Sequence, residues 1–148
     1  MQTGIFIDSN ILIYSLDPAE AGKRARAGDV IRRAVSTARL VLSPQTLNEC
    51  YRVLTDRRAI MPREDARRFV TSLMPCCTAP SDIANTRRAW EIQDATGFAW
   101  WDCLMLASAT RAGCSLFFSE DLAHGRVVDD MRIVDLFRSD TDLDTLLN

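Results

Sequence analysis

Short apolar runs alternate along this chain with longer stretches in which apolar residues recur at helical spacing. The short runs predict strands at residues 4–8, 39–44, 76–80, 114–121 and 131–137. The longer stretches predict helices at residues 10–16, 21–37, 45–59, 63–74, 81–97 and 100–113. Strands that alternate with helices are typical of a mainly parallel α/β sheet covered on both faces. We therefore expect a single domain over residues 1–148, with a peripheral acidic tail from about residue 139.

Residues that begin and end helices refine these boundaries. Ser9 or Asn10 is placed to cap the first helix, and Ser81 is placed to cap the helix that ends at Gly97. Pro62 suits the first turn of the helix at 63–74.

Two predicted strands end in acids. Asp8 follows the apolar run at 5–7, and Asp121 follows the apolar run that ends at Phe118. In parallel α/β sheets, ligands bind beyond the carboxyl ends of the strands, so both acids are candidate site residues. Capping or turn formation would explain the same residue types.

Asp102 lies in a predicted helix that is apolar on nearly all sides. Such a helix is buried over most of its surface. Pairing an acid with the dipole at a helix N-terminus contributes only ~0.3–1 kcal/mol, and burying a carboxylate without a partner costs far more. A cation or strong donors should therefore lie near Asp102, because no basic residue follows it before Arg111. We interpret Asp102 as a site residue rather than a helix cap.

The pattern around Glu49, in contrast to that around Asp102, does not indicate a site residue. In the helix at 45–59 the apolar stripe includes Leu47, Cys50 and Leu54, and Glu49 lies on the other, mixed side. Periodicity alone therefore predicts an exposed glutamate.

Composition limits the available chemistry. A hydrophobic fraction of 47% and a charged fraction of 26% are ordinary for a soluble globular protein. No apolar run approaches the ~20 residues that span a bilayer, and no secretory signal pattern is present, so we expect a cytoplasmic protein. The chain has five cysteines without a CxxC pair and a single histidine, which argues against a zinc site. A bound metal would be a hard cation held by oxygen.

The candidate acids would repel one another if they met. Two charges ~4 Å apart at an effective dielectric constant of ~20 cost about 4 kcal/mol. Three such acids therefore imply a divalent cation, and ligation by oxygen alone indicates Mg²⁺ or Mn²⁺. A cation of this kind polarises a phosphoryl oxygen and activates water, which is the chemistry of a metal-dependent phosphodiesterase.

Four stretches, in this order, resemble the motifs of PIN-domain ribonucleases, most closely the VapC-like toxins of type II toxin–antitoxin pairs. They are FIDSNILIY, SPQTLNECYRVL, FAWWDCLMLASATRAGC and LFFSEDLAHG. The resemblance implies an acidic quartet and two supporting polar residues, namely Asp8, Glu49, Asp102 and Asp121 with Asn10 and Ser119. It also implies a three-layer α/β/α fold with four to five strands.

The same resemblance implies an endoribonuclease that uses Mg²⁺ or Mn²⁺ and leaves 5′-phosphate and 3′-hydroxyl ends. Asp8, Asp102 and Asp121 would bind the metal, and Glu49 would do so directly or through water. The family is typically dimeric and is inhibited by a small antitoxin that inserts a segment into the cleft. Glu120 is an additional acid with no assigned role, and we interpret His124 as structural or turn-forming.

Two enzyme classes with similar strand ends are excluded. Phosphatases of the haloacid dehalogenase type need a second Asp at the position that Asn10 occupies. These phosphatases and the receiver domains of response regulators also need a lysine late in the chain, whereas the only lysine here is Lys23. A catalytically silent PIN fold that binds RNA or protein stays as the alternative function. Many arginines could contact phosphates, and the sequence singles out none of them.

Overall fold

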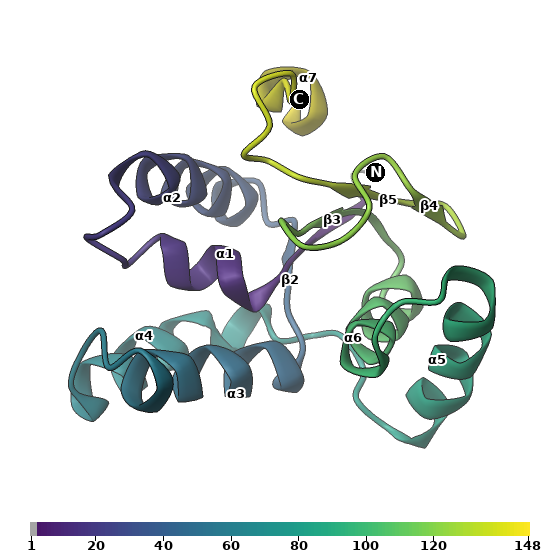
Figure 1. The fold of residues 1–148 in the computed structure, drawn as a ribbon, viewed down its shortest axis with the longest axis horizontal. Coiled ribbons are helices and arrows are strands. Elements are labelled where there is room, and N and C mark those ends of the chain that lie inside the picture. Colours follow the sequence, from purple (N-terminus) through teal and green to yellow (C-terminus); the bar gives the residue numbers. More distant parts are fainter. Residues whose placement is uncertain (1–2) are drawn as a thin grey trace.

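A computed structural model of the protein describes residues 3–148. Its centre is a five-stranded sheet with the order β2-β1-β3-β5-β4 (Figure 1). The strands are β1 (Gly4–Ile7), β2 (Leu40–Val41), β3 (Cys114–Phe118), β4 (Val127–Val128) and β5 (Met131–Val134). All pairings are parallel except that of the short β4 with β5. The predicted mainly parallel sheet is confirmed, and β4 is an antiparallel addition at one edge.

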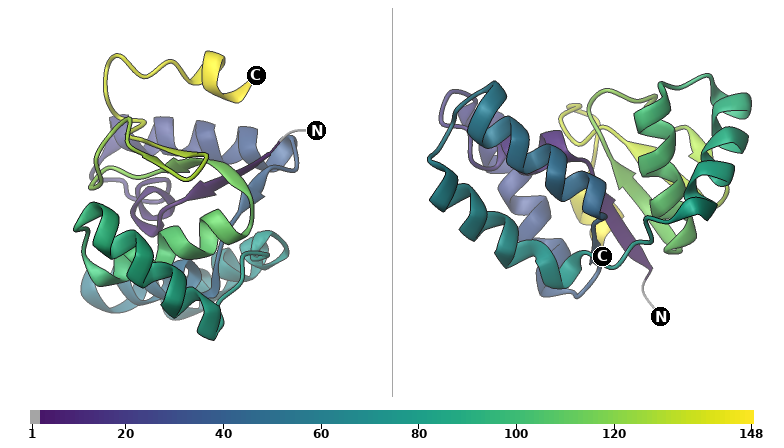
Figure 2. Two further views of the ribbon diagram at one scale, coloured as in Figure 1. Left: turned by 90° about the vertical axis from the view of Figure 1, so that its right-hand side faces the viewer. Right: turned by 90° about the horizontal axis from the view of Figure 1, so that it is seen from below.

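Helices cover both faces of the sheet, as Figure 2 shows. They are α1 (Ser9–Tyr14), α2 (Ala21–Ser36), α3 (Pro44–Arg52), the π-helical η1 (Val53–Arg57), α4 (Arg63–Leu73), the 3₁₀ turn η2 (Met74–Cys76), α5 (Ile83–Thr96), α6 (Trp100–Arg111) and α7 (Leu143–Leu147). Within residues 3–148, no helix combines the length and the apolar character needed to cross a membrane.

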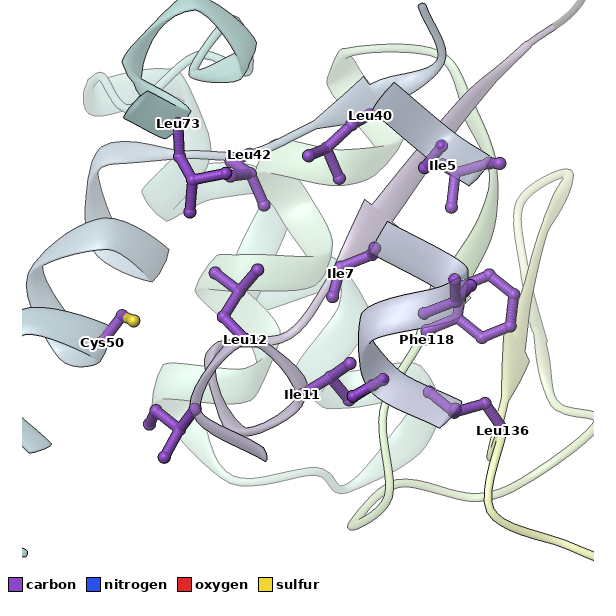
Figure 3. Close-up of a cluster of buried hydrophobic side chains, with 14 of the residues drawn as sticks. Ile5, Ile7, Ile11, Leu12, Leu40, Leu42, Cys50, Leu73, Phe118 and Leu136 are labelled. Atoms are coloured by element: carbon purple, nitrogen blue, oxygen red, sulfur yellow. The ribbon is translucent and has the colours of Figure 1, made fainter. Parts of the chain in front are cut away.

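Alternating side chains of β1 divide the core in two. Ile5 and Ile7 pack with α1, α2, α3 and α4 on one face (Figure 3), whereas Phe6 packs with α5 and α6 on the other. The Phe6 ring stacks on the ring of Phe117 from β3, with 5.1 Å between their centroids. Period-two alternation of a buried parallel strand therefore produces the three-layer α/β/α arrangement.

The predicted strand at 76–80 is wrong. The segment leaves the turn η2 and runs beside Leu42, to which it makes two backbone hydrogen bonds: Leu42 N–H to the Cys76 carbonyl at 2.9 Å, and Ala79 N–H to the Leu42 carbonyl at 3.1 Å. Pro75 and Pro80 flank it, and a proline cannot donate to a ladder. The segment therefore touches the sheet without joining it.

The chain end after residue 139 is more firmly attached than the expected peripheral tail. It contains α7, whose Leu143 and Leu147 are buried in the core beside α2. Arg26 of α2 donates to the backbone carbonyls of Leu136 and Thr141, which fixes the connection to α7. Three leucines in a five-residue helix beside several acids are too short a pattern for helical periodicity to be recognised in the sequence.

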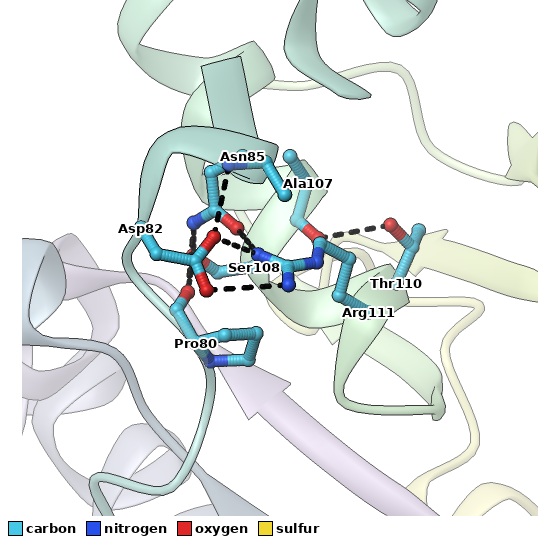
Figure 4. Close-up of polar contacts among 8 residues, drawn as sticks. Pro80, Asp82, Asn85, Ala107, Ser108, Thr110 and Arg111 are labelled. Carbon is cyan, nitrogen blue, oxygen red and sulfur yellow. Dashed lines mark hydrogen bonds and ion pairs between the residues drawn. The ribbon is translucent and has the colours of Figure 1, made fainter. Parts of the chain in front are cut away.

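A polar network holds α5 against α6 (Figure 4). The buried Asn85 donates to the Ser108 hydroxyl and to the Pro80 carbonyl, both at 2.7 Å, and accepts from Arg111. Asp82, rather than the predicted Ser81, caps α5, because its carboxylate accepts from the backbone N–H of Ala84 at 3.0 Å. The network fixes the position of α6, the helix that carries Asp102.

Candidate functional site

The carboxyl edge of the sheet brings Asp8 beside the end of β3. Ile7 pairs with Phe118 in the parallel register, so the residues that follow them leave the sheet side by side. Ser119 donates a hydrogen bond from its hydroxyl to Asp8 Oδ2 at 2.9 Å. Asp8 is therefore held where α/β sheets bind their ligands.

Asp8 also occupies the N-cap position of α1, but its carboxylate is not used as a cap. Within the described chain, the Asp8 side chain accepts no hydrogen bond from the backbone of α1. The expected capping by Ser9 or Asn10 is wrong, because α1 begins at Ser9, one residue earlier than predicted. The buried carboxylate of Asp8 points instead toward the cleft described below.

The first residues of α1 connect Asp8 with two other acids. The Ser9 hydroxyl lies 3.2 Å from Asp8 Oδ1 and 3.1 Å from Glu49 Oε2. It has one hydrogen and can donate to only one of these carboxylates at a time. Asn10 Nδ2 donates to Asp121 Oδ2 at 2.8 Å. The short helix therefore orients three acids from three different elements.

Glu49 lies on a polar stripe of α3. Gln45, Asn48, Glu49 and Arg52 follow one another at the spacing of a single helix face and line one cleft. Gln45 Nε2 lies 3.1 Å from Glu49 Oε1 and 3.0 Å from the carbonyl of Trp101, at the start of α6. Glu49 is half-buried, so the exposed position that periodicity predicts is wrong. The polar face of α3 lies opposite the start of α6, across the cleft, and is not fully exposed to solvent.

Asp102 lies in the first turn of α6 and is half-buried. Burial raises the pKa of its carboxyl group, and the charges of Glu49 and Asp121 raise it further. Among residues 3–148, no hydrogen-bond donor or cation acts on this pKa in the opposite direction. The cation or strong donors expected beside Asp102 are thus not supplied by the described protein groups.

The four acids line one cleft of about 670 Å³. Its walls are the carboxyl edge of the sheet, the start of α1, the polar stripe of α3 with η1, and the start of α6. The lining residues are Asp8, Ser9, Asn10, Gln45, Asn48, Glu49, Arg52, Val53, Arg57, Trp101, Asp102 and Asp121. This volume lies within the range of roughly 300–1,000 Å³ that is usual for ligand sites.

Asp8 carries the largest electrostatic perturbation in this cleft. Burial, followed by the charges of Asp102 and Glu49, raises the pKa of Asp8 from 3.8 to about 6, although the hydrogen bonds from Ser119 and Ser9 act in the opposite direction. A raised pKa means that the surroundings disfavour the ionised carboxylate. A bound cation would reverse this preference.

The donor set fits a hard cation. Carboxylate oxygens dominate the cleft, and none of its lining residues is histidine or cysteine. Within residues 3–148, no group of three or more His, Cys, Asp or Glu side chains is arranged so that it could hold a metal ion. Mg²⁺ usually keeps several waters and is bound through one or two carboxylates, so an open set such as Asp8 with Asp102 suits it.

Glu120 serves a structural purpose that the sequence did not reveal. Its carboxylate forms an ion pair with Lys23 of α2 and accepts a hydrogen bond from the Tyr14 hydroxyl at 2.6 Å. The Lys23 ammonium group also lies 4.7 Å from the centre of the Tyr14 ring. These contacts attach the loop that carries Asp121 to α1 and α2.

His124 lies outside the cleft. Its Nδ1 accepts a hydrogen bond from the backbone N–H of Asp135 at 3.0 Å, next to the end of β5. This contact agrees with a structural role in the turn before β4.

Comparison with known proteins identifies the family. No significant match was found among curated proteins. The family model described as the PIN domain matches residues 5–129, a range that contains Asp8, Glu49, Asp102 and Asp121. PIN domains are generally nucleases that act on RNA and usually bind divalent metal ions. Because the match covers most of the chain, and the fold has the expected three layers, the protein belongs to the PIN domain family.

Proposed function

We propose that this protein is a metal-dependent endoribonuclease that hydrolyses RNA phosphodiester bonds in the cleft lined by Asp8, Glu49, Asp102 and Asp121. One observation carries the proposal. Asp8 is buried beside Asp102 and Glu49, with a pKa of about 6, so a cation at the cleft would stabilise its ionised form. Membership of the PIN family supports the reaction class, since its members are generally nucleases.

The residues of the cleft have distinct roles in this proposal. Asp8, Asp102 and Asp121 would hold Mg²⁺ or Mn²⁺, and Glu49 would bind it directly or through water. The bound cation would supply a polarised phosphoryl oxygen and a more acidic water.

Neutral side chains position the carboxylates of the cleft through hydrogen bonds. Ser119 holds one oxygen of Asp8, Asn10 holds Asp121, and Gln45 holds Glu49. The Ser9 hydroxyl lies against the second oxygen of Asp8 and of Glu49 and can donate to only one of them at a time. Fixing the acids before a ligand arrives lowers the cost of bringing like charges together during binding.

Metal dependence tests the reaction. Protein freed of metal with EDTA and then dialysed is expected to leave a single-stranded RNA intact, because no cation then polarises the phosphoryl oxygen or activates water. Added Mg²⁺ or Mn²⁺ should restore cleavage, seen as shorter products on a denaturing gel. RNA binding without cleavage at any metal concentration would instead support the catalytically silent PIN module, which the open carboxylate set also allows.

A toxin role is the finer part of the proposal and rests on the resemblance to VapC-like toxins. In such a pair the chain would act as a cytoplasmic homodimer, and a cognate antitoxin encoded beside it would insert a segment into the cleft. Expression of the chain alone in a bacterium is expected to arrest growth, and expression of the Asp8→Asn variant is not. Equal growth with both forms would count against the toxin role and leave the nuclease proposal standing.

A further inference from the structure

The geometry points to a binding site for an unpaired RNA nucleotide formed by Trp101, Arg52 and Arg57. In this site a base stacks on Trp101 while the two guanidinium groups hold phosphates beside the scissile bond. The inference takes the identity of its ligand from the proposed nuclease function, and it adds the residues that bind the RNA. All three residues line the acidic cleft.

Trp101 is an exposed aromatic side chain next to a candidate metal ligand. It is 66% exposed, whereas its neighbour Trp100 packs against the core between α5 and α6. The backbone of Trp101 is fixed, because its carbonyl accepts the hydrogen bond from Gln45 across the cleft at 3.0 Å. Exposure of the apolar indole ring to water is unfavourable, and the Trp101 side chain is not part of either hydrophobic core cluster. Stacking with a base would bury it and is tolerant of base identity.

Arg52 and Arg57 are the basic residues of the cleft. Both are exposed, and no ion pair involving either occurs between residues 3 and 148. Arg52 follows Glu49 by three residues on α3, so one helix face presents an acid and then a cation. Guanidinium groups bind phosphate oxygens through two parallel hydrogen bonds. The basic end of the cleft can therefore hold a backbone whose next phosphate lies over the acids.

Within residues 3–148, six of the other fifteen arginines form ion pairs, and four more donate side-chain hydrogen bonds. Ion pairs join Arg33 to Asp29 and Asp144, Arg58 to Asp17, Arg68 to Glu64 and Asp65, Arg88 to Glu91 and Asp129, Arg111 to Asp82, and Arg138 to Asp140. These contacts agree with solvated helix faces and structural ion pairs. Arg52 and Arg57 differ from them by being unpaired in the described chain and by facing the acids.

The π-helical segment η1 directs Arg57 into the cleft. A π turn adds one residue to a helical turn and so changes the direction of the side chains that follow, and such turns are frequent at functional sites. The next residue, Arg58, pairs with the buried Asp17 of the loop between α1 and α2. This ion pair anchors the end of η1, so Arg57 projects from a fixed segment.

The arrangement selects single strands. A base can lie flat on Trp101 only after it has left its own stack, and in an A-form duplex the bases stay stacked and paired. Binding therefore requires an unpaired nucleotide at the cleft.

Binding measured without cleavage tests the inference. Fluorescence anisotropy in EDTA would compare a labelled single-stranded oligoribonucleotide with a hairpin in which the same bases are paired. Trp101→Ala is expected to weaken binding of the single strand roughly 10-fold, and Trp101→Phe should restore most of it. The double change Arg52→Ala, Arg57→Ala should weaken binding and lower the salt dependence by roughly 0.7 per lost phosphate contact.

Matched controls lie outside the cleft. Trp90 of α5 is 56% exposed, and Arg87 is exposed on the same helix, so Trp90→Ala and Arg87→Ala should leave binding unchanged. RNA should also quench the intrinsic fluorescence of the unaltered chain and of Trp90→Phe, but not that of Trp101→Phe.

The outcomes separate the inference from the nuclease proposal. Unchanged affinity in Trp101→Ala, equal binding of hairpin and single strand, or no RNA binding overturns the inference, even if the protein cleaves RNA in another assay. The expected loss of binding in the cleft variants supports it, even if no cleavage occurs at any metal concentration.

Discussion

The Asp8→Asn variant is expected to cleave single-stranded RNA at least about 100-fold more slowly than the unaltered chain. A bound metal stabilises the transition state by several kcal/mol, and a loss of about 1.36 kcal/mol slows a reaction tenfold. Asparagine has nearly the shape of aspartate and can still accept the hydrogen bond from Ser119. The change therefore removes one negative charge from the acidic cleft and little else. The measurement is single-turnover cleavage of an end-labelled RNA in saturating Mg²⁺ or Mn²⁺.

The control for this variant is an acid that lies away from the cleft. Asp94 is exposed on α5, so Asp94→Asn changes the net charge equally and should cleave at the normal rate. Asp102→Asn should behave like Asp8→Asn, because Asp102 has no other described partner. Circular dichroism would show that each variant is folded. If Asp8→Asn cleaves within about twofold of the unaltered chain, the proposed role of Asp8 is wrong.

The sequence predicts the positions of those candidate site residues that directly follow a buried strand. A buried parallel strand reads as a continuous apolar run, and the residue after the run must emerge at the carboxyl edge. Asp8 could be placed by this rule without any knowledge of its partners. Asp102 could be singled out because its helix is apolar nearly all round.

Periodicity failed where two helices face each other across a cleft. It correctly placed Glu49 off the apolar stripe of α3, but a polar face lining a cleft has the same pattern as a polar face in solvent. What distinguishes the two is the position of α6, and that depends on the distant network of Asn85 and Arg111. The signal that could have been used is the run of polar residues at helical spacing from Gln45 to Arg52, which continues toward Arg57.

The cleft therefore combines two features. Like-charged acids repel one another beside β1 and β3, and beside them Trp101 and two arginines are exposed, neither arginine forming an ion pair within residues 3–148. A cation would offset the repulsion between the acids, and the phosphates and a base of single-stranded RNA would bind the exposed side chains. Carboxylates whose pKa is perturbed by burial and by neighbouring charges in a cleft are candidates for a functional site.

The metal-free protein is expected to lose stability as the pH rises from about 4 to about 6. The pKa of Asp8 is 3.8 in the unfolded chain and about 6 in the folded protein. Between these values the folded protein binds a proton that the unfolded chain has released, so the free energy of unfolding falls as the pH rises. The contribution is fully present below pH ~4 and lost above pH ~6, and it amounts to about 3 kcal/mol.

The difference between two variants isolates this contribution. Urea unfolding of the unaltered chain and of Asp8→Asn is measured in EDTA at pH 4 to 8. The stability of the unaltered chain should fall relative to that of Asp8→Asn over this pH range, because titrating groups distant from the cleft contribute equally to both proteins. Near neutral pH the uncharged asparagine avoids the repulsion from Asp102 and Glu49. Millimolar Mg²⁺ or Mn²⁺ should restore the lost stability in the unaltered chain alone, since a cation replaces the proton. A stability difference that stays constant from pH 4 to 8 would show that Asp8 ionises without hindrance and needs no cation.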